Sequence, residues 1–107
     1  MSKTRKRQEQ PPATKRVLVV EDSPTQAQAL GAALEAAGYE VGLAASGDEA
    51  LQQLQPKGFD IVVSDIVMPG DVDGYELCRR IKAGPLRDVP VVLFTSLADP
   101  LDIIHGL

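Results

Sequence analysis

Short runs of consecutive apolar residues alternate along the chain with stretches in which apolar residues recur every three or four positions. The runs at 17–20, 61–63 and 89–94 are rich in β-branched residues, a composition typical of strands buried on both faces. A weaker run at 39–44 predicts one more strand. Because helical periodicity follows each run, the chain is predicted to have the order βαβαβαβα.

Capping residues mark where the four predicted helices begin. Ser23-Pro24 supplies an N-cap and a first helical residue, and Asp99-Pro100 opens the last helix, which runs to the end of the chain. The segments 46–49 and 73–76 have the form of capping boxes. The first three helices are predicted to end at the breakers that follow them, namely Gly38, Pro56 with Gly58, and Gly84-Pro85.

The helical spacing of apolar residues predicts which face each helix buries. The inward set comprises Ala27, Leu30, Leu34 and Ala37 in the first helix, Ala50, Leu51 and Leu54 in the second, and Leu77, Cys78 and Ile81 in the third. Cys78 is the sole cysteine, which excludes an internal disulfide and a metal site built on several thiolates. We therefore expect Cys78 to act as a small buried hydrophobic residue.

Strands that alternate with helices predict an α/β fold, with a parallel sheet covered on both faces and joined by right-handed crossovers. In such sheets, ligands bind beyond the carboxyl ends of the strands. The polar residues just past those ends are Glu21 and Asp22, Asp65, and Thr95 with Ser96.

Three carboxylates brought to one end of a sheet repel each other, and a hard cation bound through oxygen relieves that repulsion. Mg²⁺ is the expected ion. A carboxylate beside Mg²⁺ can attack phosphorus and form an acyl phosphate, and Asp65 is placed for that role. The Thr95 hydroxyl can then donate a hydrogen bond to the new phosphoryl group, which would link phosphorylation to movement of the following loop.

Five ordered segments carry a resemblance to a known family. They are Val-Val-Glu-Asp-Ser-Pro-Thr at 19–25, Ser-Gly-Asp-Glu-Ala-Leu at 46–51, Ser-Asp-Ile-Val-Met-Pro at 64–69, Asp-Gly-Tyr-Glu-Leu-Cys-Arg-Arg-Ile-Lys at 73–82, and Val-Pro-Val-Val-Leu-Phe-Thr-Ser at 89–96. Over residues 16–107 the chain resembles the receiver domain of two-component response regulators. The resemblance implies a flavodoxin-like, doubly wound parallel sheet with strand order 2-1-3-4.

The resemblance also implies roles for individual residues. Asp65 would be the phosphoacceptor, and Glu21 and Asp22 would form the acidic pair at Mg²⁺. The backbone carbonyl of Val67 would be a further metal ligand, and Thr95 would be the switch hydroxyl. The implied phosphodonor is a phosphohistidine on a sensor histidine kinase or a histidine phosphotransfer domain, so the module would be a signalling domain rather than a turnover enzyme.

The chain departs from the family pattern in two places. Three residues, Gly70-Asp71-Val72, stand where the family usually has two. The family also continues with a fifth strand, whose end carries a lysine that pairs with the phosphoryl group, and with a fifth helix. We expect their absence here to leave the fourth strand, at 91–94, as an uncovered apolar edge and to leave the first helix without its neighbour on that face of the sheet. The expectation is a receiver domain at 17–107 that belongs to a longer or disrupted chain, or that another chain completes.

Charge separates a tail from the rest of the chain. Residues 1–16 hold six Lys or Arg and one acidic residue, whereas residues 17–107 hold five Lys or Arg and fourteen acidic residues. The tail is predicted to be disordered, and the acidic body is expected to repel nucleic acid rather than bind it.

No apolar run reaches the ~20 residues of a membrane span, so the sequence predicts a cytoplasmic protein. The sequence is compatible both with a monomer and with a homodimer.

Two other functions are compatible with parts of the sequence. Asp71 and Asp73, with a Glu near the first strand, could serve a Mg²⁺-dependent phosphoryl-transfer or nuclease-type enzyme, although Asp73 has a ready role as an N-cap. A degenerate receiver could bind a partner without responding to phosphate. The intact acidic residues and Thr95 favour the phosphoacceptor, whereas the missing lysine favours the degenerate receiver. His105 has no ligand partner in the sequence and is expected to be incidental.

Overall fold

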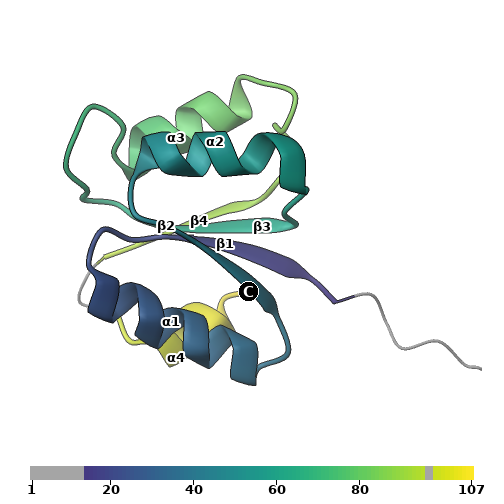
Figure 1. The fold of residues 1–107 in the computed structure, drawn as a ribbon, viewed down its shortest axis with the longest axis vertical. Helices are drawn as coiled ribbons and strands as arrows, with labels where there is room; N and C mark the ends of the chain where they lie inside the picture. Colours follow the sequence, from purple (N-terminus) through teal and green to yellow (C-terminus); the bar gives the residue numbers. More distant parts are fainter. Residues whose placement is uncertain (1–13, 96–97) are drawn as a thin grey trace, which may run out of the picture.

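The computed structural model describes residues 14–95 and 98–107 and contains a four-stranded parallel sheet with strand order β2-β1-β3-β4, which confirms the predicted α/β fold (Figure 1). The strands are β1 (Arg16–Val20), β2 (Glu40–Ala44), β3 (Ile61–Asp65) and β4 (Val91–Phe94), and the helices are α1 (Pro24–Ala36), α2 (Gly47–Lys57), α3 (Gly74–Lys82) and α4 (Pro100–His105). Most of the predicted tail, residues 1–13, and Ser96 lie outside the described residues. Arg16 already belongs to β1, opposite Glu40.

The sheet separates two hydrophobic cores, with α2 and α3 on one face and α1 and α4 on the other (Figure 1). Side chains alternate along β1, so Leu18 and Val20 enter the α2–α3 core while Val17 and Val19 enter the α1–α4 core. All four are fully buried, as the continuous apolar run predicted. Within residues 14–95 and 98–107, no helix combines the length and the apolar character needed to cross a membrane.

The predicted loss of a neighbour for α1 is wrong, because α4 packs against α1. Ile103 of α4 is only 7% exposed and lies in the same core as Leu30 and Leu34 of α1. An apolar sheet face exposed to water is unfavourable, and the last apolar helix of the chain covers it. β4 remains an edge strand, as expected, and each of its four residues is half-buried.

Two helix ends and one core position are among the points at which the structure differs from the prediction. Pro56 does not end the second helix, which runs to Lys57 and ends at Gly58 in the left-handed conformation (φ 67°). A proline in the last helical turn removes one hydrogen-bond donor but supplies a helical φ, whereas the left-handed cap favours glycine. The first helix ends at Ala36, so Ala37 is an exposed cap rather than a core residue. Cys78 is half-buried, at the border of the α3 face whose buried residues are Gly74, Leu77 and Ile81.

The predicted helix caps form. In each capping box the N-cap side chain accepts its expected hydrogen bond, but the glutamate does not return a bond to the N-cap amide. The Ser46 hydroxyl accepts from the Glu49 amide at 3.1 Å, and Asp73 Oδ1 accepts from the Glu76 amide at 2.8 Å. The reciprocal bonds differ: Glu49 Oε1 accepts from the Ala45 amide at 2.6 Å, and the Glu76 carboxylate binds arginines instead. The N-terminal turns are therefore capped, while the glutamates serve other contacts.

Glu76 is predicted to make the stability of the protein depend on pH in the acidic range. Both Arg79 (2.6 Å) and Arg80 (2.7 Å) contact its Oε2 atom, and these hydrogen bonds lower the pKa of Glu76 from 4.5 to about 2. A depressed carboxyl pKa stabilises the folded state above the unfolded pKa, and this contribution is lost as pH falls from 4.5 toward about 2. We expect Glu76→Gln to lower the free energy of unfolding at pH 6 more than at pH 3, measured by urea titration. An equal loss at both pH values would contradict this assignment.

Candidate functional site

Three carboxylates meet at the carboxyl end of the two central strands. Glu21, Asp22 and Asp65 each place one carboxylate oxygen within 4.8 Å of the others. The parallel register explains this, because Val20 of β1 lies opposite Ser64 of β3, so Glu21, just past β1, lies beside Asp65, the last residue of β3. The structure thus brings together the acidic residues that the sequence predicted for a metal site.

Two of these three carboxylates are removed from water. Asp65 is 2% exposed and Glu21 is 3% exposed, whereas Asp22 is exposed. A buried pair of like charges is unfavourable unless an opposite charge or hydrogen bonds compensate it. The exposed Asp22 leaves one side of the cluster open to solvent, so an ion or a phosphoryl group can reach it from that side.

Glu21 shows the need for a compensating charge most directly. Its Oε2 atom accepts a hydrogen bond from the Ser23 amide at 2.9 Å, but within the described residues its buried Oε1 atom has no hydrogen-bond partner. Burial raises the pKa of Glu21, the carboxylates of Asp65 and Asp22 raise it further, and the Ser23 amide opposes them. A hard cation bound through oxygen would satisfy Oε1 and offset the repulsion, so the donor set fits Mg²⁺.

Asp65 is held by the loop that follows β3. Its Oδ1 atom accepts a hydrogen bond from the Val67 amide at 3.3 Å, while the Val67 side chain is 76% exposed. The Ser64 hydroxyl donates to the backbone carbonyl of Asp65 at 2.9 Å. The hydrogen bond to Oδ1 restricts the rotation of the Asp65 carboxylate and places the Val67 backbone beside it.

Thr95 stands just past β4, at the same end of the sheet. It follows Phe94, which lies opposite Asp65 in the register, and the carbonyl of Phe94 accepts a hydrogen bond from the Ile66 amide at 2.9 Å. The Thr95 side chain is exposed. The register therefore places Thr95 at the end of the sheet that carries Asp65.

The residues of the alternative metal enzyme are not assembled into a site. Asp71 is exposed, and Asp73 caps α3 through the bond to the Glu76 amide. Neither belongs to the acidic cluster that the described part of the chain contains. His105 is an exposed residue in the last turn of α4.

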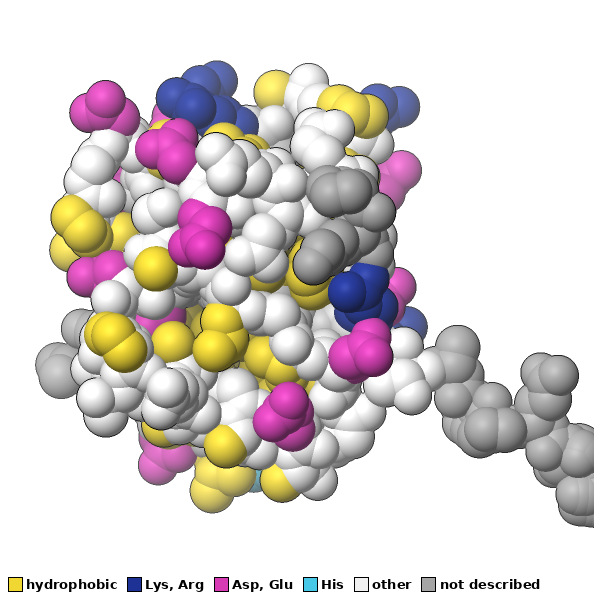
Figure 2. All heavy atoms as spheres, in the orientation of Figure 1, with side chains coloured by type: hydrophobic (Ala, Val, Ile, Leu, Met, Phe, Trp, Pro, Cys, Tyr) yellow, Lys and Arg dark blue, Asp and Glu magenta, His cyan; other side chains and the backbone are white. Residues whose placement is uncertain are grey.

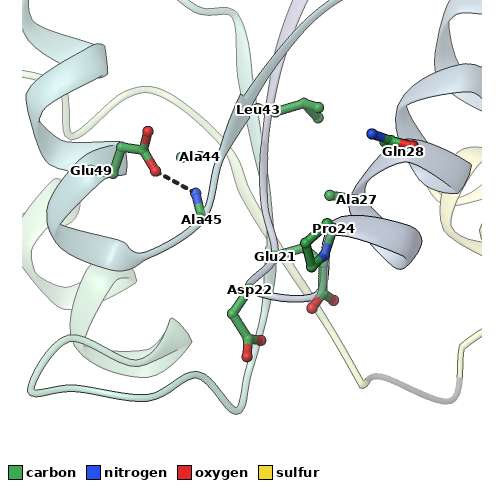
Figure 3. A pocket seen from close by; sticks show the side chains of 9 residues that line it. All are labelled: Glu21, Asp22, Pro24, Ala27, Gln28, Leu43, Ala44, Ala45 and Glu49. Carbon is green, nitrogen blue, oxygen red and sulfur yellow. Dashed lines mark hydrogen bonds between the residues drawn. The ribbon is translucent and has the colours of Figure 1, made fainter.

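Two hollows of about 200 Å³ each flank Glu21, and the sequence did not indicate either of them. One lies between the start of α1 and the end of β2, where Pro24, Ala27 and Leu43 form an apolar wall beside Asp22 (Figure 3). The other lies between α1 and α4 and is lined by Leu30, Phe94 and Ile103. On the face shown in Figure 2, acidic side chains are spread over both helix layers.

Comparison with known proteins agrees with this geometry. The sequence model of the response regulator receiver domain matches residues 17–107. A gliding motility regulatory protein of Myxococcus xanthus is 41% identical over 92% of this chain, and the response regulator PleD of Caulobacter vibrioides is 42% identical over 86%. The chain spans only 13% and 20% of the length of these two relatives.

Solved structures show the same fold. The receiver domain of a signal transduction histidine kinase from Syntrophus aciditrophicus has 44% identity and a TM-score of 0.73, with 87% of this chain and 70% of that chain covered. A chemotaxis response regulator of Vibrio cholerae has 25% identity and a TM-score of 0.79, with 88% and 96% covered. Since the family match runs from Val17 of β1 to the end of the chain and includes the acidic cluster at the carboxyl end of the sheet, the chain belongs to the response regulator receiver domain family.

Proposed function

We propose that this chain accepts a phosphoryl group from a phosphohistidine onto Asp65 and that Mg²⁺ supports the transfer. The observation that carries the proposal is the meeting of three carboxylates within 4.8 Å, with Asp65 buried among them. Glu21, Asp22, Asp65 and the backbone carbonyl of Val67 would hold the ion. Mg²⁺ would neutralise the charge of the incoming phosphoryl oxygens, which three uncompensated carboxylates would otherwise repel.

Asp65 acts as the nucleophile in this proposal. The Val67 amide engages Oδ1, which orients the carboxylate and leaves lone pairs of Oδ2 for bonding. An oxygen of Asp65 attacks phosphorus, the phosphorus–nitrogen bond of the phosphohistidine breaks, and its electron pair returns to the imidazole nitrogen, which takes a proton from solvent. The product is an aspartyl phosphate at the end of β3.

Thr95 is the proposed switch residue. Its exposed hydroxyl, one residue beyond the β4 position that pairs with Asp65, would donate a hydrogen bond to the new phosphoryl group. Such a bond would draw the end of β4 toward Asp65 and move the chain that follows. The partners are then a sensor histidine kinase or a histidine phosphotransfer domain, and the module works as a signalling domain in the cytoplasm.

The experiment that tests this proposal is treatment of the purified chain with acetyl phosphate and Mg²⁺, read by intact mass. We expect a gain of one phosphoryl group that disappears when EDTA removes the metal ion, because the unscreened carboxylates then repel the donor. Circular dichroism on the same sample reports whether the chain is folded. A folded chain that gains no mass, with any concentration of Mg²⁺, would favour the phosphate-independent interaction module.

A further inference from the structure

The loop between β3 and α3, residues 66–73, carries the proposed Val67 ligand and is one residue longer than the family pattern. Its middle is exposed at Pro69, Gly70 and Asp71, and Gly70 adopts a left-handed conformation with φ 93°. Both flanks of this exposed part are buried, since Met68 is 6% exposed and Val72 is 3% exposed. The extra residue therefore sits in a segment whose two ends are fixed.

Gly74 contacts the start of the loop, next to Asp65, and fixes it there. Its amide donates to the carbonyl of Ile66 at 2.9 Å, so the start of α3 lies directly against the end of β3. A Cβ atom at this position would collide with the carbonyl oxygen of Asp65 and would lie 2.8 Å from Cα of Ile66. Both obstacles are backbone atoms, so no change of side-chain rotamer could relieve them.

Gly47 fixes the end of the loop, at Val72. A Cβ atom on Gly47 would lie 2.5 Å from the carbonyl oxygen and 2.7 Å from Cβ of Val72. The first residue of α2 thus packs against the loop as closely as the first residue of α3 packs against β3. The buried Val72 side chain also belongs to the core that α2 and α3 share with the sheet.

We infer that Gly47 and Gly74 are positioning residues of the metal site, because their close backbone contacts hold the loop that carries Val67 in place beside Asp65. This inference rests on the proposed function, since it concerns the same Mg²⁺ ligands. The two contacts act on the ligand loop from two different helices, α2 and α3. The exposed apex at 69–71 can therefore lengthen without moving Val67.

Gly74→Ala tests the inference at the contact nearest to Asp65. The added methyl group must push the Asp65–Ile66 backbone away from α3, which displaces both the Asp65 carboxylate and the Val67 carbonyl. We expect Mg²⁺ to bind at least about tenfold more weakly, the usual scale for residues that orient metal ligands. Binding is read from the amide chemical shifts of residues 65–67 during a Mg²⁺ titration, a signal that comes from folded molecules alone.

Gly84→Ala is the matched control. The same methyl group there would lie 3.5 Å from the nearest atom, the carbonyl oxygen of Arg80, which is ordinary contact. We expect its Mg²⁺ affinity to stay within about twofold of the parent protein. Equal Mg²⁺ affinity in Gly74→Ala and Gly84→Ala would overturn the inference, whereas a parent protein that binds no Mg²⁺ would overturn the proposed function instead.

A second pair of variants decides the matter if Gly74→Ala does not fold. Val72→Ala loosens the contact with Gly47, and Val17→Ala removes the same atoms from a fully buried position on β1, far from the loop. Both should lose similar stability, by circular dichroism during urea unfolding. Only Val72→Ala is expected to weaken Mg²⁺ binding, and unchanged binding in both would contradict the inference.

Discussion

Asp65→Asn is expected to abolish phosphorylation by acetyl phosphate completely while the protein remains folded. An amide cannot supply the anionic oxygen that attacks phosphorus, and the neutral side chain is also a weaker ligand for Mg²⁺ than a carboxylate. The carbonyl oxygen of the asparagine can still accept the hydrogen bond from the Val67 amide, so the local backbone should persist. Intact mass after treatment with acetyl phosphate and Mg²⁺ measures the result.

The same substitution is expected to stabilise the metal-free protein. Asp65 is 2% exposed and its charge raises the pKa of Glu21, so removal of that charge relieves repulsion between buried carboxylates. A gain on the order of 1 kcal/mol would raise the Tm of a domain of this size by about 4 °C or more. Thermal unfolding in EDTA measures the Tm of the variant and of the parent protein. Added Mg²⁺ should reduce the difference between the two Tm values, because the parent protein alone keeps all three carboxylate ligands.

Asp71→Asn is the matched control for both measurements. Asp71 lies in the loop after Asp65 but is exposed and stands outside the acidic cluster. We expect it to accept one phosphoryl group as the parent protein does and to unfold at nearly the same temperature. Phosphorylation that survives in Asp65→Asn would place the acceptor on another residue and would reject the proposed mechanism.

Leu77→Ala is expected to lower the free energy of unfolding by about 3 kcal/mol. The Leu77 side chain is fully buried in the core between α3 and the sheet, so its removal loses apolar burial and leaves a cavity. A domain of this size has a total stability of roughly 5–15 kcal/mol, so the variant should unfold at clearly lower urea concentration. Circular dichroism during a urea titration measures the shift.

Leu101→Ala makes the same change on a helix surface. Leu101 is 59% exposed in α4, so its truncation should change the free energy of unfolding by no more than about 0.5 kcal/mol. The contrast between the two leucines isolates burial from any effect of alanine on helix propensity. A similar loss in both variants would mean that α4 packs against more of the protein than the structure shows.

The alternation of strands and helices and the acidic cluster could be predicted from local sequence patterns, whereas the strand order 2-1-3-4 was implied by the resemblance to the receiver family. Continuous β-branched runs such as 61–63 identify buried strands, and capping residues such as Ser23 and Asp73 identify helix starts, since propensity and caps act over a few residues. Once the alternation predicts a parallel sheet, the residues after β1 and β3 must meet at one end. Glu21, Asp22 and Asp65 follow from that rule without any knowledge of side-chain packing.

Contacts between distant segments decided the rest. The position of α4 against α1 depends on which apolar surface remains uncovered after the sheet has formed, and no pattern within residues 98–107 reports that. The Oε1 atom of Glu21, for which the described residues offer no hydrogen-bond partner, and the close approach of Gly74 to Asp65 both depend on backbones set to within a fraction of an ångström. Such packing is a property of the whole core, because interiors are close-packed and each contact constrains its neighbours. The sequence alone therefore determined which residues meet at the site, and the tertiary structure decided how they are held there.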